Sequence, residues 1–378
     1  MINQMRLDEC CISISDGDHL PPPKSDCGVP FITISNIDPV NNSIDFSDTM
    51  TVPKKYYDSL LGIRKALVGD ILYSVVGSFG IPVLIKENKE FVFQRHIAIL
   101  RPNSKIVRPA YLYYIMKSKS FYAQADSYAI GSAQRTISLS SLRRMKVSIP
   151  STDVQDQVIA ALTAYDNLIE VNNKRIKVLE QMAENLYKEW FVRLRFPGHE
   201  SVPFENGLPK GWKPCKLSEL FDVRYGKEHK EIGDGQIPIF GSGGIMRYGD
   251  QALYAGESVL IPRKGTLNNI MYYNGPFWTV DTMFYTVLLK DDLAKYAYFT
   301  LKNVDMESYN SGAALPSMTT DILYHLKIIV PDDNTLEWFD RFIDGVFKQT
   351  EAVKKLNENL IRQRDLLLPR LMSGKLEV

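Results

Sequence analysis

The chain has 378 residues, of which 45% are hydrophobic and 24% are charged, with a formal net charge of +1. This composition is that of a globular protein, and the length indicates two or three domains of roughly 150 residues each. The balanced charge excludes a broadly basic coat for nucleic acid, so any such surface must arise from local clustering of cations.

The cysteines, histidines and apolar runs exclude further classes. Cys10, Cys11, Cys27, Cys215 and the five histidines lack the paired spacing of a zinc site, so we expect no metal and reduced, mostly buried thiols. The start of the sequence has no secretion signal. The most apolar run, ILYSVVGSFGIPVLI, is interrupted by Gly, Ser and Pro. These features predict a cytoplasmic protein that does not span a membrane.

Residues 1–150 are expected to form the first domain. Residues 1–130 are rich in Tyr, Ile, Val and Thr and punctuated by Gly, Pro, Asn and Asp, which is typical of a mainly β domain with short helices such as AYLYYIMKS. The stretch GSAQRTISLSSLRRMKVSIP, residues 131–150, closes the domain with a basic cluster. A solvated strand face explains this cluster adequately, and Arg135 is kept as a candidate for a phosphate contact.

Residues 151–192 predict a long helix. The sequence between 152 and 191 has no Gly or Pro, and Thr152 with Gln155 has capping-box spacing. About 40 helical residues span ~58 Å. Apolar side chains three and four residues apart form a coiled-coil seam that Asn172 interrupts: Ile169, Ile176, Leu179, Ala183, Leu186 and Trp190. The prolines and glycines that follow predict a linker over residues 193–207.

Residues 208–331 repeat the design of the first domain. A β-rich stretch, 208–311, is followed by GAALPSMTTDILYHLKIIVP, residues 312–331, which aligns with the first joint without gaps. Identical residues are paired at Gly131 and Gly312, Ala133 and Ala314, Leu142 and Leu323, Lys146 and Lys327, and Pro150 and Pro331. The sequence therefore contains an internal repeat whose joint connects each domain to a helix.

Residues 332–378 predict the second helix. Asn334 with Glu337 is a candidate cap, and Gly345 and Pro369 are candidate kinks. Its seam is expected at Val346, Val353, Leu356, Leu360 and Leu367, with Gln349 and Gln363 among the polar positions.

The two apolar stripes have two interpretations. A single amphipathic helix usually packs on its own domain, whereas two long stripes in one chain favour helices that cover each other. Antiparallel pairing is the simplest arrangement when a domain intervenes. The predicted fold class is α+β, with two β-rich domains alternating with two long helices that form an antiparallel coiled coil, in a pseudo-two-fold repeat.

Several ordered stretches carry a family resemblance. They are GQIPIFGSGGIMRYGDQALYAGESVLIPRKGT, the GSAQRTIS and SGAALPSM joints, IPSTDVQDQVIAAL and LLLPRLMSGKL. Over essentially its whole length the chain resembles the specificity subunit of type I restriction-modification systems. In that family each of two target-recognition domains reads one half of a bipartite DNA site, and the helices carry the methylation subunits.

The resemblance implies partners and the location of the chemistry. It implies double-stranded DNA, two methylation subunits, and restriction subunits that join through them. It also implies no cofactor in this chain, since S-adenosylmethionine, ATP and Mg would belong to the partner subunits. Because long helices are rigid, we expect their length to set the spacer between the two half-sites.

Diverged loops on a shared frame are the candidates for DNA contact. GDILYSVVGSFG is echoed by GESVLIPRKGT, and FVFQRHIAIL by FWTVDTMFYTVLL. Glycine loops let the backbone approach phosphate, and Arg and Gln suit base edges, although strand turns and surface ion pairs are the alternatives. The candidates are Gly77, Ser78, Phe79, Gln94, Arg95, His96 and Arg135 in the first domain, and Lys227, Lys230, Arg247, Tyr248, Arg263, Lys264, Gly265 and Thr266 in the second.

Catalysis by this chain is not expected. HLPPPK lacks the Asn or Asp and the aromatic residue of an adenine methyltransferase motif, and no GxxxxGK[ST] loop is present. The triplets Glu228-His229-Lys230 and Glu87-Asn88-Lys89 fit a nuclease fragment that arises by chance in charged chains. The remaining alternative is a coiled-coil scaffold without DNA readout, which explains the seams but not the diverged polar loops.

Overall fold

The computed structural model describes residues 3–131, 135–310 and 316–372, so Ala133, Gly312 and Ala314 of the repeated joint lie outside the described residues. The chain divides into two compact units. Unit 1 comprises Met1–Val171 and Leu356–Val378, and unit 2 comprises Asn172–Lys355. Each unit holds one β-rich domain and part of both long helices.

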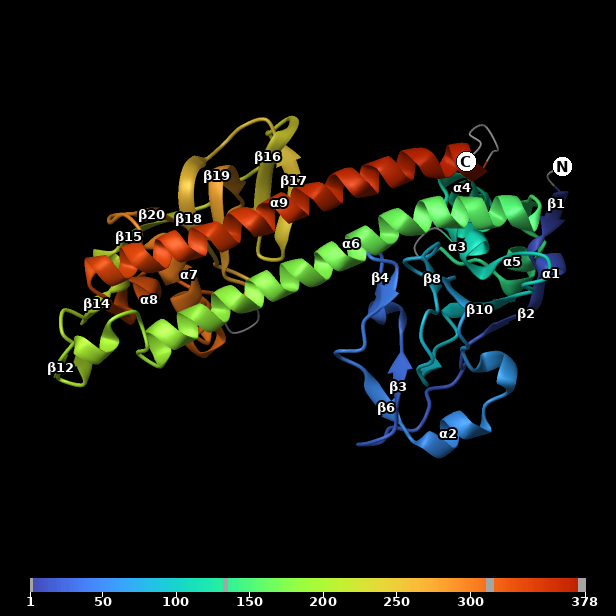
Figure 1. Ribbon diagram of the computed structural model, residues 1–378, viewed down its shortest axis with the longest axis horizontal. Helices are drawn as coiled ribbons and strands as arrows, with labels where there is room; N and C mark the ends of the chain where they lie inside the picture. Colours follow the sequence, from blue (N-terminus) through green and yellow to red (C-terminus); the bar gives the residue numbers. More distant parts are fainter. Residues whose placement is uncertain (1–2, 132–134, 311–315, 373–378) are drawn as a thin grey trace. The chain divides into compact units, whose positions relative to one another are not determined.

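The domain of unit 1 is built on a four-stranded antiparallel sheet (Figure 1). Its order is β2 (Cys11–Asp16), β10 (Ile97–Pro102), β7 (Ile71–Ser74) and β8 (Pro82–Leu84). A second sheet has the order β6 (Met50–Val52), β3 (Val29–Ile32) and β9 (Val92–Phe93), with β3 and β9 parallel. Two-stranded pairs are formed by β1 (Asn3–Arg6) with β11 (Lys146–Ile149) and by β4 (Ile37–Asp38) with β5 (Ser43–Ile44).

Short helices complete this domain. The expected helix in AYLYYIMKS is confirmed as α3 (Pro109–Lys117), whose Pro109 lies in the first turn, where no backbone N–H is needed. Its Tyr111, Leu112 and Met116 share one core with the sheet residues Ile71 and Leu100. The other helices are α1 (Leu7–Cys10), α2 (Lys54–Ser59), α4 (Lys119–Tyr128), α5 (Leu139–Arg144) and the 3₁₀ turns Ile34–Asn36 and Gly62–Arg64.

The domain of unit 2 contains a six-stranded sheet. Its order is β15 (Phe221–Tyr225), β20 (Met283–Leu288), β18 (Tyr254–Pro262), β19 (Met271–Thr279), β16 (Asp234–Gly241) and β17 (Gly244–Gly249). Smaller pairs are β12 (Phe204–Glu205) with β13 (Leu208–Pro209), and β14 (Lys213–Lys216) with β21 (Lys327–Val330). The helices are α7 (Ala294–Lys302), α8 (Thr320–His325) and the 3₁₀ turns His199–Ser201, Leu217–Glu219 and Met306–Tyr309.

The repeated joint has the same structure in both units. In unit 1 the helix α5 leads into β11, which pairs antiparallel with β1. In unit 2 the helix α8 leads into β21, which pairs antiparallel with β14. In each case a long helix begins directly after the strand. The joint therefore closes the domain by pairing with a strand from its beginning.

The long helices are α6 (Thr152–Tyr187), which continues as a π-helical turn over Lys188–Val192, and α9 (Asp333–Met372). In unit 1, Val158 and Leu162 of α6 share a core with Leu368 and Leu371 of α9. In the same unit Asp166 pairs with Arg364. Residue numbers rise along one helix as they fall along the other, so the segments are antiparallel.

The helix segments of unit 2 pair in the same sense. Glu180 lies 3.7 Å from Lys354, and the ring of Trp190 lies 5.8 Å from that of Phe339. The predicted α+β class, with β-rich domains alternating with antiparallel long helices, is confirmed. The α9 helix runs without a break through Gly345 and Pro369.

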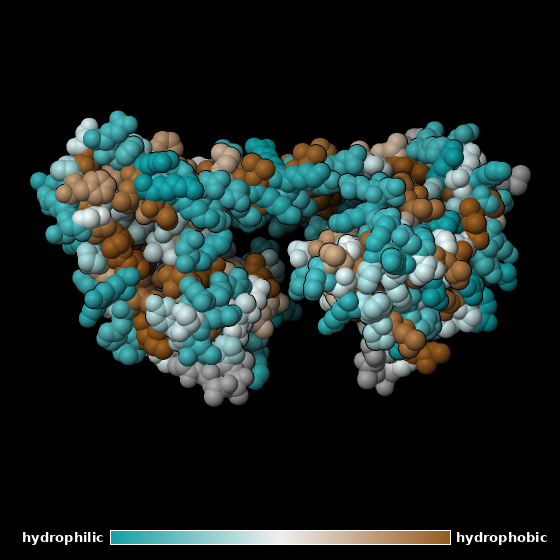
Figure 2. All heavy atoms as spheres, turned by 90° about the horizontal axis from the view of Figure 1, so that it is seen from below, coloured by the Kyte–Doolittle hydropathy of each residue, from teal (hydrophilic) through white to brown (hydrophobic). Residues whose placement is uncertain are grey.

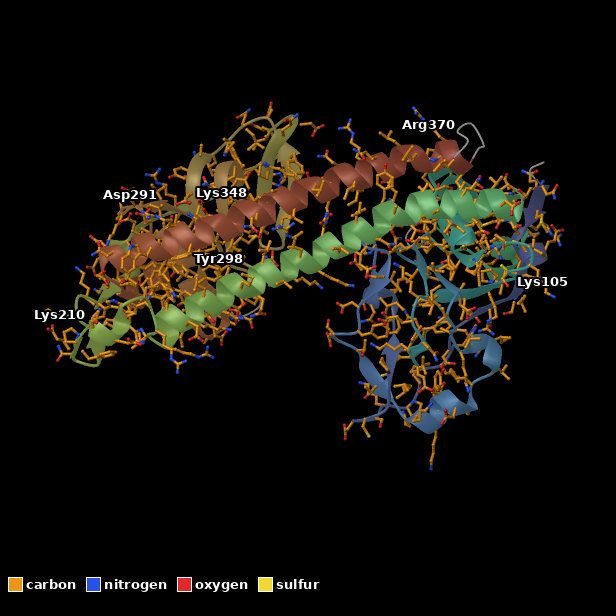
Figure 3. All side chains as sticks on the ribbon, viewed as in Figure 1. Lys105, Lys210, Asp291, Tyr298, Lys348 and Arg370 are labelled. Carbon is orange, nitrogen blue, oxygen red and sulfur yellow. The ribbon has the colours of Figure 1, made fainter. Side chains whose placement is uncertain are left out.

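Within each unit the helix segments also pack on the β-rich domain, so contact with a domain, as in the first interpretation of the stripes, accompanies contact between the helices. In unit 2 the buried cluster joins Trp190 and Phe339 of the helices to Phe221 of the sheet. Tyr298 of α7 lies beside the long helices (Figure 3), with its ring 6.3 Å from that of Phe347. The apolar stripe is thus shared between the partner helix and the domain.

The expected seam needs one correction, at Leu356. This side chain is 49% exposed, whereas Val353 and Asn357 are buried. The three-and-four spacing continues from Val353 through Asn357 to Leu360, which leaves Leu356 on the outer face. Ile169, Leu179 and Trp190 are buried, and Ile176, Leu186, Leu360 and Leu367 are half-buried.

The polar seam positions are likewise displaced by one residue from the expected ones. Gln349 and Gln363 are exposed, and the buried polar residues of α9 beyond its first turn are Thr350, Asn357 and Arg364. These three recur once per heptad, which places a polar group at the same position of three successive repeats.

Both predicted helix caps are wrong. Gln155 is fully buried and does not cap α6, because its side chain bonds the backbone of Ile106 (3.1 Å) and Pro150 (2.9 Å). At α9 the cap is Asp332, whose carboxylate accepts from the Thr335 N–H (3.1 Å) and hydroxyl (2.7 Å). Glu337 instead binds Arg341.

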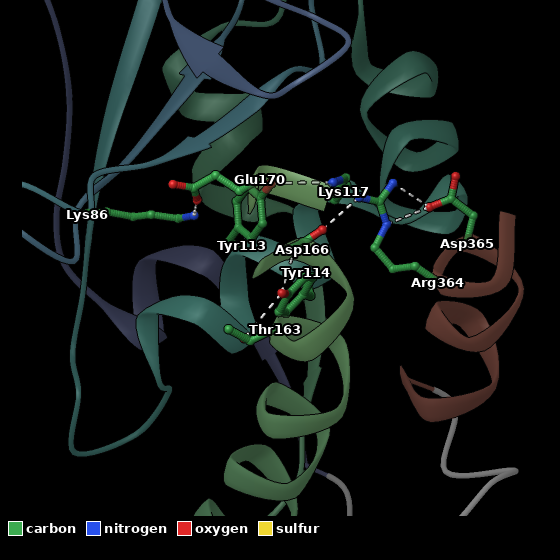
Figure 4. A network of polar contacts seen from close by, with 9 residues as sticks. All are labelled: Lys86, Tyr113, Tyr114, Lys117, Thr163, Asp166, Glu170, Arg364 and Asp365. Carbon is green, nitrogen blue, oxygen red and sulfur yellow. Dashed lines mark hydrogen bonds and ion pairs between the residues drawn. The ribbon is translucent and has the colours of Figure 1, made fainter. Parts of the chain in front are cut away.

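A buried polar network attaches the first domain to both helices within unit 1 (Figure 4). The Tyr114 hydroxyl of α3 donates to Asp166 Oδ2 of α6 at 2.7 Å, and Arg364 Nη1 of α9 donates to Asp166 Oδ1 at 2.7 Å. Arg364 also binds its neighbour Asp365. Burial next to this network lowers the pKa of Lys117 to about 8. Asp166 is therefore the group that joins three elements.

Unit 2 uses a different group for the same purpose. Lys295 of α7 is 3% exposed and lies 2.9 Å from Glu257 of β18 and 2.9 Å from Asp340 of α9. Asp344, one turn further along α9, lies 3.7 Å away. Burial alone would lower the pKa of Lys295, but these carboxylates raise it. Here the domain supplies the cation and one of its anions, and the helix α9 supplies Asp340 and Asp344.

Replacing Asp166 tests the network in unit 1. Among the described residues, Asp166→Ala leaves Arg364, whose side chain is 10% exposed, with its partly exposed neighbour Asp365 as the remaining ion-pair partner. We expect a loss of about 3 kcal/mol in the free energy of unfolding, because a buried charge loses its partner. Urea and thermal denaturation followed by circular dichroism measure this loss.

The exposed pair Arg108 and Asp156 supplies the matched control. Asp156→Ala should cost less than about 1 kcal/mol. The double variant Asp166→Leu with Arg364→Leu should recover most of the lost stability, since no unpaired charge remains. An Asp166→Ala protein as stable as the control variant would contradict the role of Asp166.

Candidate DNA interface

The two domains have the same arrangement of sheet strands, here called the frame, and the candidate loops lie at corresponding places in each. In unit 1 the order β2-β10-β7-β8 corresponds to β15-β20-β18-β19 in unit 2, antiparallel throughout. The parallel contact between β3 and β9 corresponds to that between β16 and the end of β19. The correspondence assigns each loop of one domain a counterpart in the other.

The loop after the first sheet strand is held identically in both domains. In unit 1 the Gly17 N–H donates to the Ile97 carbonyl (3.2 Å). In unit 2 the Gly226 N–H donates to the Met283 carbonyl (2.9 Å). A Cβ on either glycine would lie 2.0 Å from a backbone carbonyl oxygen, so the close approach requires glycine at both positions.

The glycine-containing loops are joined to the repeated joint by matched hydrogen bonds. Gly77 N–H donates to the Arg135 carbonyl (3.2 Å) in unit 1. Gly265 N–H donates to the Pro316 carbonyl (3.1 Å) in unit 2. Both glycines have positive φ, 73° and 87°, which glycine adopts at little cost. The joint thus fixes the loop as well as connecting domain and helix.

The first predicted loop of unit 1 contributes two exposed residues and one buried one. Gly77 and Ser78 are exposed. Phe79 is 8% exposed, and its ring stacks on Tyr122 of α4 at 5.4 Å. The structure corrects the expectation for Phe79, because its side chain holds the loop on the core and does not face solvent.

The second predicted loop of unit 1 is the turn before β10. Arg95 is exposed, and Gln94 and His96 are half-buried. Arg135 is exposed, but its guanidinium pairs with Asp126 of α4. Among the described residues Arg95 therefore differs from Arg135 in having no side-chain hydrogen bond or ion pair.

The candidates of unit 2 also include both exposed side chains and side chains that other residues hold. Lys227 and Thr266 are exposed, and Tyr248 is 49% exposed. Lys230 lies 3.5 Å from Glu228. Arg247 donates to the carbonyl of Ile232 (3.0 Å), so its guanidinium holds the loop before β16.

Two cations, Arg263 and Lys264, directly follow the end of β18. The Arg263 guanidinium lies 5.2 Å from the centre of the Tyr225 ring and donates to the Asp281 carbonyl (3.1 Å). Lys264 and Gly265 beside it are half-buried, and Lys264 pairs in a β-bridge with Ser317 of the joint. These contacts bring β15, β18 and the turn before β20 together.

One polar cluster of unit 1 was missed by the sequence reasoning. At the end of β2, Asp18 accepts from the Tyr56 hydroxyl (2.9 Å) and lies 3.6 Å from Arg64, and Asp16 binds His19 (2.8 Å). The only signal was the echo of SDGDH in RYGKEH, in which Asp18 corresponds to Lys227. The match between these two stretches is short and polar and shows no apolar periodicity, so it did not predict a strand or a site.

The face shown in Figure 2 is mixed in character. Hydrophilic side chains cover most of the face shown in Figure 2, with small apolar patches between them.

Within residues 3–131, 135–310 and 316–372, no group of three His, Cys, Asp or Glu side chains is placed to hold a metal ion. In the same part of the chain, no helix is both long and apolar enough to cross a membrane.

Comparison with known proteins agrees with this architecture. The family model of the type I restriction modification DNA specificity domain matches twice, at residues 16–181 and 209–362. The chain belongs to this family of DNA specificity proteins, and the resemblance noted in the sequence is confirmed.

Individual relatives match most of the chain. The type I restriction enzyme MjaIX specificity subunit of Methanocaldococcus jannaschii is 25% identical over 71% of this chain and 69% of its own. The HindI specificity subunit of Haemophilus influenzae is 20% identical over 82% of this chain and 86% of its own. The crystal structure of the S subunit from M. genitalium has a TM-score of 0.59 at 16% identity, covering 98% of this chain and 96% of that one.

The shared frame predicts a strong effect of substituting its glycine in unit 2. Gly226→Ala would place a Cβ 2.0 Å from the Val280 carbonyl oxygen, so the loop or the following turn must move. We expect a loss of roughly 1–3 kcal/mol in stability, as for other overpacked sites. Gly243→Ala is the control, since nothing lies within 4 Å of its added methyl group. Equal melting temperatures for the two variants would contradict the role of the close approach.

Proposed function

We propose that this chain is the DNA-reading subunit of a type I restriction-modification complex. Each β-rich domain reads one half of a bipartite site in double-stranded DNA. The long helices carry two methylation subunits, and the restriction subunits join through these. This assignment extends the family membership to the partners and to the division of labour.

The observation that carries the proposal is the pair of matched frames with different exposed side chains. The backbone contacts of Gly17 and Gly226 are the same, and so are those of Gly77 and Gly265. The exposed residues at corresponding places differ, as Arg95 and Asp281 do. A scaffold has no need of two identical frames with different polar edges, whereas a reader of two different half-sequences does.

Apolar side chains on the outer faces of the helices support the docking of partner subunits. In unit 1, Leu168 of α6 is 54% exposed and Leu366 of α9 is 59% exposed. In unit 2, Met182 of α6 is 54% exposed, and Trp338 and Phe342 of α9 are 44% and 61% exposed. Large exposed apolar and aromatic groups are typical of protein interfaces.

The proposal places the chemistry in the partners. Methylation of adenine with S-adenosylmethionine, and cleavage with ATP and Mg, are assigned to the methylation and restriction subunits. This chain contributes the position of the site. We assign it no catalytic residue and no cofactor.

Binding to random duplex DNA tests the proposed function. The chain with its methylation subunits should select one bipartite sequence from a randomised duplex pool, and the methylation subunits alone should select none. Gel shift and sequencing of the bound fraction measure this. Affinity should fall steeply with salt, because phosphate contacts release counterions. A complex that binds no duplex, or binds all duplexes equally, would refute the proposal.

The length of the helices should set the spacer between the half-sites. One added heptad in α6 after Val171 and one in α9 after Lys355 preserve the seam and lengthen each helix by ~10 Å. We expect a spacer longer by about three base pairs, at 3.4 Å per pair, with both half-sequences unchanged. The selected sequences from the same pool give the answer directly.

Insertion of four residues in α6 alone is the control, because it shifts the seam of α6 against that of α9 and locally unwinds the pair. It should not give the longer spacer with unchanged half-sequences that the matched heptads give. Altered half-sequences with an unchanged spacer would show that helix length does not set the distance.

A further inference from the structure

A four-residue turn before the central strand occupies the same place in both domains. In unit 1 the Ile97 N–H donates to the Gln94 carbonyl (3.0 Å), which closes the turn 94–97 at the start of β10. In unit 2 the Met283 N–H donates to the Val280 carbonyl (2.9 Å), which closes the turn 280–283 at the start of β20. Arg95 and Asp281 are the second residues of these turns and correspond to each other.

Both turns are held by the neighbouring strand. The Val75 N–H donates to the His96 carbonyl (2.9 Å) in unit 1, and the Arg263 N–H donates to the Thr282 carbonyl (2.8 Å) in unit 2. In unit 1 the Arg95 N–H also donates to the Asp18 carbonyl (2.9 Å). In unit 2 the Val280 N–H donates to the Phe240 carbonyl (3.0 Å). The backbone of each turn is thus fixed on at least two sides. The Cα atom that carries the side chain of the second residue is therefore held in a defined position.

The side chains at this position are free to bind. Arg95 and Asp281 are exposed, and among the described residues neither side chain has a hydrogen bond or ion pair. Two other arginine candidates are less available, since Arg135 pairs with Asp126 and Arg247 holds a backbone carbonyl. Arg95 and Asp281 therefore combine a fixed backbone with an unused polar group.

The sign of the charge at this position distinguishes base contact from phosphate contact. A carboxylate is repelled by phosphate, so Asp281 at a DNA-facing edge is unfavourable unless it accepts from a base amino group. Arg263 beside it, whose guanidinium donates to the Asp281 carbonyl, reduces this repulsion. An arginine at the corresponding place in the other domain has the opposite hydrogen-bonding character.

We propose that Arg95 and Asp281 are corresponding specificity-determining residues of opposite polarity. Arg95 donates to the O6 and N7 acceptors of a guanine in one half-site. Asp281 accepts from the N4 amino group of a cytosine in the other half-site. The inference rests on the proposed function, because it requires that each domain enters a half-site.

Selection with substituted complexes tests the inference. Arg95→Asp should change the preferred base at one position of one half-site, from guanine towards cytosine, by roughly ten- to a hundredfold, and leave the other half-site unchanged. Asp281→Arg should do the reverse in the other half-site. Asp281→Asn should shift the preference towards adenine, which asparagine contacts through N6 and N7.

Two charge changes at exposed positions outside the frame are the matched controls. Lys105 and Asp291, both labelled in Figure 3, are exposed and lie outside the turns 94–97 and 280–283 in the sequence. Lys105→Asp and Asp291→Arg alter the net charge as the test variants do and should leave both half-sites unchanged. Thermal melting of each variant should match the wild type, since neither Arg95 nor Asp281 makes a side-chain contact to lose.

The outcomes separate the inference from the proposed function. If the wild-type complex selects a bipartite site and the Arg95 and Asp281 variants select the same two half-sites, the inference is wrong and the proposed function stands. A uniform change of affinity for all sequences would likewise overturn it, because phosphate contact gives that result. If the wild-type complex selects no sequence, the proposed function itself fails.

Discussion

The pairing of α6 with α9 is the constraint on which the remaining structure depends. A helix of 36 residues with an apolar stripe cannot stay solvated on all sides, and its partner covers the stripe where the domains do not. The seam of α9 is not uniformly apolar, since Thr350, Asn357 and Arg364 recur once per heptad. Polar groups at such positions cost stability and exclude other registers, and the bond between Arg364 and Asp166 fixes one register in unit 1.

The two domains share one strand arrangement, but different polar contacts attach them to the long helices. In unit 1 the domain contributes the neutral Tyr114 hydroxyl to a charge pair supplied by the helices, whereas in unit 2 it contributes the buried cation Lys295. An incoming domain without a lysine at position 295 would leave Asp340 without its cation. Recognition domains are therefore exchangeable only between chains that share the same attachment.

Sequence reasoning succeeded where a signal extends over many residues. The long helices, the repeated joint and α3 follow from periodicity, the absence of Gly and Pro, and matched spacing. It failed where one contact from a distant segment decides: Gln155 has the spacing of a cap but binds Ile106, and Phe79 lies in a glycine loop but stacks on Tyr122. Leu356 failed because a seam on one helix is ambiguous by one residue until its partner is placed.

The sequence predicted only some of the exposed polar residues in the loops and turns of the two domains, because these residues are not determined by packing. Glycine positions such as Gly17 and Gly226 are dictated by a backbone approach and are preserved, whereas nothing in the frame dictates the exposed residue of the turn. Because that side chain makes no internal contact, its replacement costs the fold little. A domain built in this way can change a base preference, worth about 1–3 kcal/mol per contact, without changing its stability. Divergence at Arg95 and Asp281 is thus permitted by the packing, and the proposed base contacts of these two residues require it.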